Sequence, residues 1–397
     1  MKPTIRQPVT DNNTRPFMII WETTQACDLS CRHCRAEAQP NHHPAQLTTA
    51  QAKTLLQQAA GFGKPSPIFI FTGGDPFKRA DLFELTRYAK EVGLVAAVSP
   101  SGTPLLNREN LSKLKQSGAR VISLSLDAST PERHDDFRQV PGSFALTVQG
   151  WKTARDLGLK VQVNTTVTRY NLEDLPQLFA LVQELGAMTW SLFFLVPTGR
   201  GLESDEISPA EYEAVMHFLY DASKYISAKT TEGHHYKRVV LQRSILDEKG
   251  LSPEDYFSLH PIYAQLKAEL AEIVAKRGLR PRPAIKRTPM NINAGNGFVF
   301  ISHLGQVFPS GFMPVTVGNV KTRSLVDIYR DAPLFKTLRN AERLEGRCGA
   351  CEFRAVCGGS RSRAYALTGR PMAEEPFCEY QPGSFPFQAE LAAVLRR

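Results

Sequence analysis

Between residues 17 and 201, six short apolar segments alternate with helix-like segments, and this alternation restricts the possible folds more than any other feature. The apolar segments are 17–24, 68–76, 94–99, 121–128, 159–168 and 189–201. The helix-like segments between them are 46–60, 81–92, 107–117, 143–157 and 174–185. Apolar strands alternating with helices predict a parallel sheet covered on both faces. We therefore predict an α/β fold, either a partial (β/α)6 barrel or an open doubly wound sheet, with its chemistry at the carboxyl ends of the strands.

After residue 201 the pattern changes. Helices are predicted at 208–226, 261–277 and 324–339, with polar, basic loops between the first two, and a β-hairpin is predicted at 297–311. A chain of 397 residues is long enough for one large domain and a smaller appended one. The predicted divisions are an N-terminal extension (1–16), a core barrel (17–201), a helical substrate region (202–290) and a cysteine-rich domain (291–397).

The seven cysteines form one group near each end of the chain. No apolar run approaches the ~20 residues that cross a bilayer, and residues 1–16 lack the apolar core of a signal peptide. We therefore expect a cytoplasmic protein with no membrane span. In that compartment clustered cysteines indicate metal binding or catalysis more often than disulfides.

Cys27, Cys31 and Cys34 follow the first predicted strand with the spacing C-x3-C-x2-C. Three thiolates suit two kinds of site. One is a zinc ion with a fourth ligand from elsewhere, such as His33. The other is a [4Fe–4S] cluster in which the three cysteines leave one iron open to a substrate or cofactor.

The segment "CDLSCRHC" (27–34) resembles the signature loop of the radical S-adenosylmethionine (SAM) enzymes. The resemblance implies a [4Fe–4S] cluster on these cysteines, with the amino and carboxylate groups of SAM on the fourth iron. It also implies reductive cleavage of SAM to a 5′-deoxyadenosyl radical that abstracts hydrogen from a substrate. His33 stands where this family often has an aromatic residue near the adenine.

Further motifs, at the ends of successive predicted strands, resemble the SAM-binding positions of this family. Gly73, Gly74 and Asp75 in "TGGD" resemble its Gly-Gly-Glu motif, with Asp in place of Glu. Taken alone, the glycine pair is equally well explained as a tight turn. The other SAM contacts implied by the resemblance are Ser125, Asp127, Arg138 and Asn164, together with Thr198 and Gly199 in the motif "PTGRG" after the sixth predicted strand.

The C-terminal group consists of Cys348, Cys351, Cys357 and Cys378. Four thiolates close either a tetrahedral zinc site or a fully ligated [4Fe–4S] cluster. The spacing resembles the SPASM module of many radical SAM enzymes, which implies an auxiliary [4Fe–4S] cluster here. Ser310 and Arg361 stand where that module has cysteines for a second auxiliary cluster, so two clusters in total are expected. Four nearby arginines would raise the auxiliary cluster's potential: Arg347, Arg354, Arg361 and Arg363.

Three functions remain open on the sequence. The first is oxidative modification of a porphyrin propionate, as in radical SAM enzymes of alternative heme synthesis. The net charge of +9, the basic run 276–287 and a histidine such as His234 or His235 would suit an iron-bound anionic tetrapyrrole. The second is peptide maturation, although residues 1–16 are too short for a leader-binding domain. The third is a non-enzymatic, zinc-stapled α/β binding protein.

A radical SAM enzyme also requires an electron donor, such as flavodoxin or ferredoxin. No nucleic-acid-binding module is recognisable in the sequence, so we expect no nucleic-acid partner. The sequence identifies no residue that must act as general acid or base.

Overall fold

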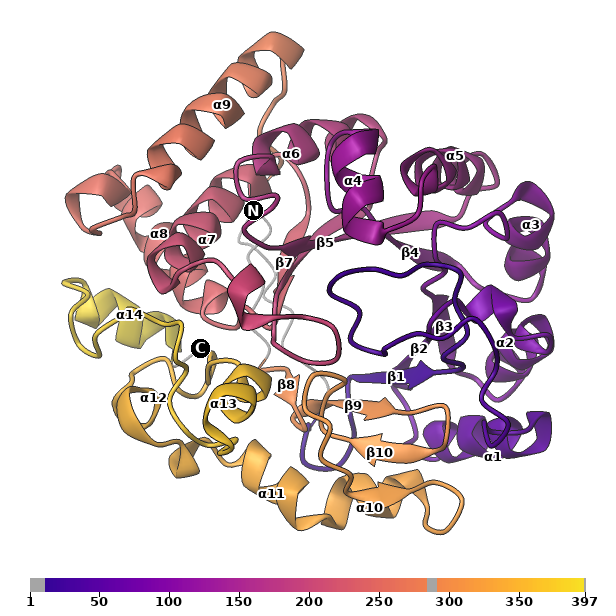
Figure 1. The fold of residues 1–397 in the computed structure, drawn as a ribbon. Helices are drawn as coiled ribbons and strands as arrows, with labels where there is room; N and C mark the ends of the chain where they lie inside the picture. Colours follow the sequence, from indigo (N-terminus) through magenta and orange to yellow (C-terminus); the bar gives the residue numbers. More distant parts are fainter. Residues whose placement is uncertain (1–10, 284–290, 396–397) are drawn as a thin grey trace.

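The computed structural model describes residues 11–283 and 291–395, and it confirms the predicted α/β fold. Parallel strands curve around a central space and helices cover their outer side (Figure 1). The barrel strands are β1 (Met18–Glu22), β2 (Ile68–Thr72), β3 (Val95–Val98), β4 (Val121–Ser125), β5 (Lys160–Val167), β6 (Thr189–Phe194) and β7 (Ala228–Thr231). The helices between and after them are α1 (Thr49–Ala60), α2 (Leu82–Glu91), α3 (Arg108–Gln116), α4 (Pro131–Arg138), α5 (Ser143–Asp156), α6 (Leu175–Glu184), α7 (Pro209–Ser223), α8 (Tyr236–Lys249) and α9 (Ile262–Arg277).

The order of the strands distinguishes between the two predicted architectures. Strands β1 to β7 pair in chain order, each parallel to the next. A doubly wound sheet reverses its strand order part-way, and this sheet does not. The protein is therefore a partial barrel, open between β7 and the far edge of the sheet.

Alternation along the strands separates an outer face, packed on helices, from an inner face. On the outer face, Trp21, Phe69 and Phe71 are fully buried, and the Trp21 and Phe71 ring centroids lie 5.8 Å apart. Trp190 of β6 packs in the same way on Phe179 of α6 and Phe218 of α7. Burial of these large apolar side chains under the helices stabilises the barrel.

The C-terminal residues extend the same sheet. The predicted hairpin is confirmed as β9 (Gly297–Ile301) and β10 (Gln306–Phe308), which pair antiparallel, and β9 lies parallel to β1. The remaining elements are β8 (Asn293–Ala294), β11 (Gly318–Asn319), α10 (Leu325–Asp331), α11 (Pro333–Arg339), α12 (Gly346–Ala350), α13 (Arg361–Thr368) and α14 (Gln388–Leu395). The four predicted divisions of the chain remain predictions.

Several elements differ from the sequence-based expectation, among them β7, a seventh barrel strand that was not predicted. Helix α8 replaces part of a predicted loop, and its buried face includes Arg238 and Arg243, which hide its apolar periodicity. Helix α4 was not predicted because six of its eight residues are polar or charged. The predicted helix 324–339 is two helices, because Ala332 is extended before Pro333, the conformation that a following proline favours.

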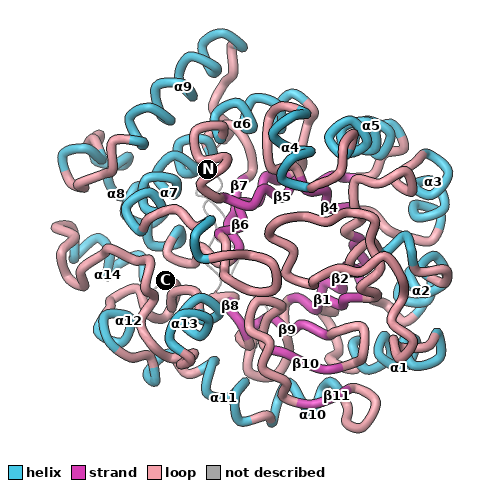
Figure 2. Tube along the Cα trace, viewed as in Figure 1, coloured by secondary structure: helices cyan, strands magenta, loops and turns pink. Residues whose placement is uncertain are grey.

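The loop after β1, which carries the N-terminal cysteines, lies over the centre of the barrel (Figures 1 and 2). Within the described parts of the chain, no helix combines the length and apolar character needed to cross a membrane.

Candidate functional site

The first three cysteines come together on the loop after β1. Cys27 and Cys31 are buried and Cys34 is half-buried, and the three pack with Leu29 in one small apolar cluster. Backbone hydrogen bonds hold the loop, from Cys27 N–H to the Gln39 carbonyl (2.8 Å) and from Cys34 N–H to the Cys31 carbonyl (3.2 Å). Burial raises the pKa of the Cys27 thiol to about 11, so the protein alone does not favour its thiolate.

The glycine turns after β2 and β6 press directly on this loop. A Cβ at Gly74 would lie 2.5 Å from the Ala26 carbonyl oxygen, and one at Gly199 would lie 2.5 Å from the Cys34 carbonyl oxygen. Gly199 also has φ +63°, which disfavours other residues. Only glycine therefore allows these turns to lie against the cysteine loop, and the structure brings the "TGGD" and "PTGRG" motifs together there.

Asp75 is buried, and its carboxylate is already engaged by the turn. It accepts hydrogen bonds from the Thr103 hydroxyl (2.8 Å) and from the Phe77 backbone N–H (3.1 Å). Burial raises the pKa of this carboxyl group despite these hydrogen bonds. Within the structure the Asp75 side chain shapes the turn, and its predicted contact with SAM remains a prediction.

Arg138 connects a cysteine to a buried carboxylate. Its Nη1 lies 3.4 Å from Cys31 Sγ, and its Nη2 forms an ion pair with Asp127. Asp127 also accepts the Thr166 backbone N–H at 2.7 Å. Burial raises the pKa of Asp127, but Arg138, the Thr166 hydrogen bond and the other neighbours together outweigh burial, and the net pKa is lowered. The two residues that the sequence assigned separately to SAM thus lie together beside the cysteine loop.

His33 presents a neutral ring next to the same site. Its imidazole stacks on Phe137, with ring centroids 4.4 Å apart and an interplanar angle of 13°. Burial, and then the Arg138 charge, lower the pKa of His33 to about 3. Among the described residues its Nδ1 has no hydrogen-bond partner. A flat, neutral ring beside Cys34 suits both the predicted adenine contact and a ligand role.

Of the remaining predicted SAM contacts, Ser125 ends β4, Asn164 lies within β5, and Thr198 lies in the turn after β6. Ser125 pairs in register with Asn164, so both face the inner side of the barrel. Asn164 Oδ1 accepts a hydrogen bond from Gln162 at 2.7 Å. The Thr198 hydroxyl lies 3.4 Å from the Phe312 carbonyl, which joins the β6 turn to the C-terminal region.

The four C-terminal cysteines line one cavity, as their spacing predicts. Burial raises the pKa of Cys351 and Cys357 to about 12 each. Arg361 Nη2 lies 3.8 Å from Cys348 Sγ, and Arg238 Nη2 lies 4.0 Å from Cys378 Sγ. The sequence identified Arg361 but missed Arg238, which lies on the unpredicted helix α8.

His235 is a second residue that the sequence interpreted differently. It is 0% exposed and lines the same cysteine cavity. This position does not suit the axial contact to a porphyrin iron that the sequence suggested. Burial lowers the pKa of His235 to about 4, and neither ring nitrogen has a partner among the described residues.

A buried polar network around Glu232 includes Ser310, the first position where a second auxiliary cluster would need a cysteine. Glu232 accepts hydrogen bonds from Ser310 (3.2 Å) and Ser362 (3.0 Å), and also from Ser360. Its backbone has φ 57°, unusual for a residue other than glycine. Glu232 was not predicted, because no sequence signal marks a buried carboxylate whose partners are serines distant in the chain.

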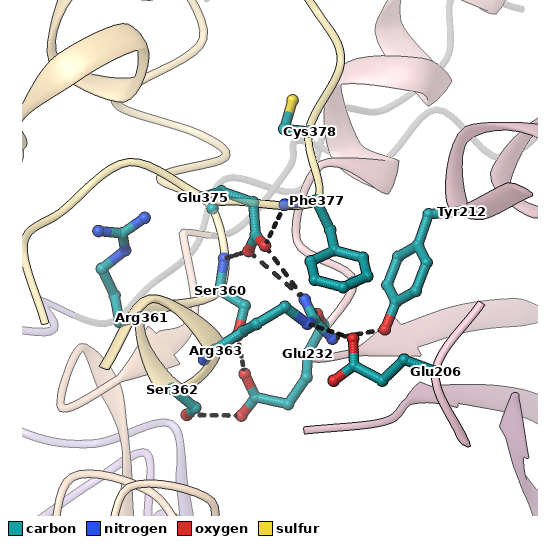
Figure 3. Close-up of polar contacts among 12 residues, drawn as sticks. Glu206, Tyr212, Glu232, Ser360, Arg361, Ser362, Arg363, Glu375, Phe377 and Cys378 are labelled. Carbon is teal, nitrogen blue, oxygen red and sulfur yellow. Dashed lines mark hydrogen bonds and ion pairs between the residues drawn. The ribbon is translucent and has the colours of Figure 1, made fainter. Parts of the chain in front are cut away.

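Arg363 lies at the centre of this network rather than beside a cysteine. Its guanidinium pairs with Glu375 (3.3 Å) and donates to the Tyr212 hydroxyl (3.0 Å) and the Leu195 carbonyl (2.8 Å). The Glu375 backbone N–H in turn lies 3.3 Å from Cys348 Sγ. The network therefore joins Leu195, which follows β6, to Cys348. Figure 3 shows Arg363 at its centre, with Glu375, Glu206 and Tyr212 around the guanidinium.

In the described residues, no three His, Cys, Asp or Glu side chains lie close enough together to hold a single metal ion. The case for iron–sulfur clusters therefore depends on the donor chemistry and on the family. The donors are suitable, because both groups consist of thiols in largely apolar surroundings with arginines nearby.

Comparison with known proteins identifies the family. Residues 21–182 match the Radical SAM superfamily model. The AdoMet-dependent heme synthase of Methanosarcina barkeri is 40% identical over 370 residues, which cover 93% of this chain and 97% of that protein. The chain belongs to the radical SAM superfamily. Its relatives use a [4Fe–4S] cluster with SAM, and so does this enzyme.

Other relatives agree with this assignment. The AdoMet-dependent heme synthase of Nitratidesulfovibrio vulgaris is 39% identical, covering 96% of this chain and 97% of that protein. The PqqA peptide cyclase of Gluconobacter oxydans is 28% identical, covering 92% and 91%. The structure of Streptococcus suis SuiB bound to S-adenosylmethionine matches the fold with a TM-score of 0.63, at 16% identity, covering 92% of this chain and 78% of that one. The family consists of enzymes, so the non-enzymatic binding protein is no longer supported.

Proposed function

We propose that this radical SAM enzyme removes carbon dioxide oxidatively from the propionates of an iron-bound porphyrin. The observation that carries the proposal is the 40% identity to an AdoMet-dependent heme synthase across nearly the whole of both chains. The peptide cyclase relative is more distant, at 28% identity. Greater similarity along the full length, including the C-terminal cysteine region, favours the tetrapyrrole over a peptide.

In this proposal Cys27, Cys31 and Cys34 hold the cluster that binds SAM. When bound, this cluster supplies the electron that splits SAM into methionine and the hydrogen-abstracting 5′-deoxyadenosyl radical. The chain's own contribution is placement: the glycine turns let the backbone approach the cysteine loop, and Arg138 fixes that loop against β4. Ser125, Asn164 and Thr198 border the same face and contact SAM.

The four C-terminal cysteines hold an auxiliary [4Fe–4S] cluster in this proposal. Loss of a hydrogen atom and then of carbon dioxide from a propionate leaves one electron to be removed. The auxiliary cluster supplies that capacity when bound, and Arg238 and Arg361 beside its cysteines favour the reduced, more negative state.

We further propose a cytoplasmic location and an electron-transfer partner such as flavodoxin or ferredoxin. The cysteines are all unpaired, which suits a reducing compartment. Lys276, Arg280 and Arg282 are exposed and suit an acidic partner surface, whereas Lys286 and Arg287 of the basic run lie outside the described residues.

The test is an anaerobic assay of the reduced, cluster-loaded enzyme with SAM and iron coproporphyrin III. We expect carbon dioxide release and a porphyrin product of correspondingly lower mass. A peptide that instead loses two hydrogens, with the porphyrin unchanged, would replace this proposal by the peptide alternative. Absorbance near 400 nm in the loaded protein distinguishes iron–sulfur clusters from zinc thiolates in the same preparation.

A further inference from the structure

A row of polar side chains crosses the inner face of the barrel. In the parallel register, Ser125 of β4 pairs with Asn164 of β5, Asn164 pairs with Ser191 of β6, and Ser191 pairs with Lys229 of β7. Residues paired in this way point to the same side of a sheet. Trp190, the neighbour of Ser191, packs on the outer helices, so Ser191 and the whole row face inward.

Lys229 ends this row without a counter-charge. Among residues 11–283 and 291–395, no hydrogen bond or ion pair involves its ammonium group. The side chain is partly buried, and burial lowers the pKa of Lys229. A cation in such a place is costly unless an anion accompanies it.

Ser191, the strand partner of Lys229, places a hydroxyl group that can donate a hydrogen bond next to this cation. Its hydroxyl is fully buried and has no hydrogen-bond partner among the described residues. Buried hydroxyls are nearly always hydrogen-bonded, so an unsatisfied one adjoining an unpaired ammonium indicates a missing partner. A group that would satisfy both at once is a carboxylate, which accepts from an ammonium and from a hydroxyl.

The opposite side of the barrel has apolar side chains beside an ion pair of Glu22 with Arg35, whose guanidinium lies over the Phe300 ring. Ile20 of β1 pairs with Ile70 of β2 and with Phe300 of β9, and all three face inward. Figure 1 shows β1 and β9 across the central space from β5 and β7. Arg35 already has Glu22 as its partner, so Lys229 is the cation of the two that lacks an anion among the described residues. Apolar side chains together with an unpaired cation suit an apolar ring system with carboxylates at its periphery.

We propose that Lys229, together with the Ser191 hydroxyl, binds a carboxylate of the substrate on the inner face of the barrel. The inference rests on the proposed function, because a porphyrin with propionate side chains is the substrate considered. Lys229 is then a specificity-determining residue: it anchors one carboxylate and thereby fixes how the ring lies relative to the cysteine loop.

The test compares iron coproporphyrin III with its tetramethyl ester, which has the same ring but no carboxylate charge. Binding to the cluster-loaded enzyme is measured by absorbance titration for the wild type, Lys229→Met, Lys229→Arg and the control Lys152→Met. Lys152 is exposed on the outer helix α5. SAM affinity is measured on the same samples.

We expect Lys229→Met to weaken binding of the free acid by about tenfold to hundredfold, the usual value of a charge-assisted hydrogen bond, and to leave ester binding unchanged. Lys229→Arg should keep most of the preference for the free acid over the ester. Lys152→Met should keep this preference in full. Because the acid-to-ester ratio is measured within each variant, general damage to the fold, which affects both ligands, does not imitate the result.

An unchanged acid-to-ester ratio in Lys229→Met would overturn the inference. So would a loss of SAM affinity in that variant, because the cation would then belong to the cofactor site. If the wild type converts iron coproporphyrin III normally while Lys229→Met is unaffected, only this inference fails. If the wild type neither binds nor converts the porphyrin, the proposed function fails and this inference fails with it.

Discussion

The two cysteine sites share one arrangement of an arginine, but they differ in their number of thiols and in the backbone around them. At each, an arginine joins a cysteine to a buried carboxylate: Arg138 lies between Cys31 and Asp127, and Arg238 lies between Cys378 and Glu213. The N-terminal site has only three thiols and is pressed by glycine turns from two other strands. The C-terminal site has four thiols around one cavity.

The difference between the two sites indicates that they have different tasks. Three thiols leave room for an exchangeable ligand, and the glycine turns bring bare backbone close to it. Four thiols complete the coordination of a cluster, so the second site is suited to electron transfer rather than to substrate binding. Substitutions at the two sites should therefore affect SAM cleavage and product formation separately.

The largest expected effect is the loss of a cysteine. Cys31→Ala should abolish formation of 5′-deoxyadenosine, because it removes one of the three thiolates that hold the SAM-binding cluster. Cys351→Ala should still produce 5′-deoxyadenosine without porphyrin product, because the auxiliary cluster lacks a ligand. Chromatography of SAM products measures both. Continued 5′-deoxyadenosine formation in Cys31→Ala would show that the N-terminal cysteines do not hold the catalytic cluster.

The next effect concerns the glycine turn after β6. Gly199→Ala should lower the rate of SAM cleavage by about a hundredfold, because the new Cβ would lie 2.5 Å from the Cys34 carbonyl oxygen and displace the cysteine loop. Gly186→Ala is the matched control: Gly186 also has a positive φ, of +71°, but nothing lies within 4 Å of its Cβ position. Equal losses in the two variants would mean that backbone strain, rather than the contact with the loop, is responsible.

A smaller, more selective effect is expected from the two arginines. Arg238→Met should make the midpoint potential of the auxiliary cluster more negative and leave SAM affinity unchanged, whereas Arg138→Met should weaken SAM binding and leave that potential unchanged. Each variant leaves a buried carboxylate without its ion-pair partner, which lowers folding stability by about 3–5 kcal/mol. Asp127→Asn is therefore added to Arg138→Met, and Glu213→Gln is added to Arg238→Met, to restore stability. If both variants change the SAM affinity, or both change the midpoint potential, the two sites do not have separate tasks.

The smallest effect is expected at His235. Its neutral imidazole lines the cysteine cavity without a protein partner among the described residues, so an N–H directed at sulfur should stabilise the reduced cluster. His235→Leu should therefore lower the auxiliary midpoint potential in a redox titration followed by electron paramagnetic resonance. His234→Leu, at a half-buried neighbour that does not line the cavity, should not. If His235→Leu and the wild type have the same auxiliary midpoint potential, the imidazole does not stabilise the reduced cluster.

Much of the barrel could be predicted from the sequence, because its strands are apolar and its helices amphipathic. Strand β5, for example, lies within the predicted segment 159–168, and α1 within 46–60. The cysteine ligand groups were also predictable, since their spacing is local in the chain. The motifs "TGGD" and "PTGRG" could be recognised for the same reason.

What could not be predicted depends on charges that pair only in the folded protein. Helix α8 was interpreted as a loop because Arg238 and Arg243 interrupt its apolar face, although both are buried against Glu213 and Asp221. Lys229 carries no local signal, because its significance follows from the register with Ser191. Nor could the sequence show that Arg138 and Asp127 contact each other, since that ion pair requires α4 to fold beside β4.

The SAM-binding cluster can be observed alone in protein that carries both Cys351→Ala and Cys357→Ala, because only two thiols then remain at the C-terminal site. The protein is reconstituted and reduced without oxygen, and its electron paramagnetic resonance spectrum is recorded before and after addition of SAM. We expect SAM to change the spectrum, because SAM binds the iron that Cys27, Cys31 and Cys34 leave free. An identical spectrum with and without SAM, from a sample that contains the cluster, would contradict it.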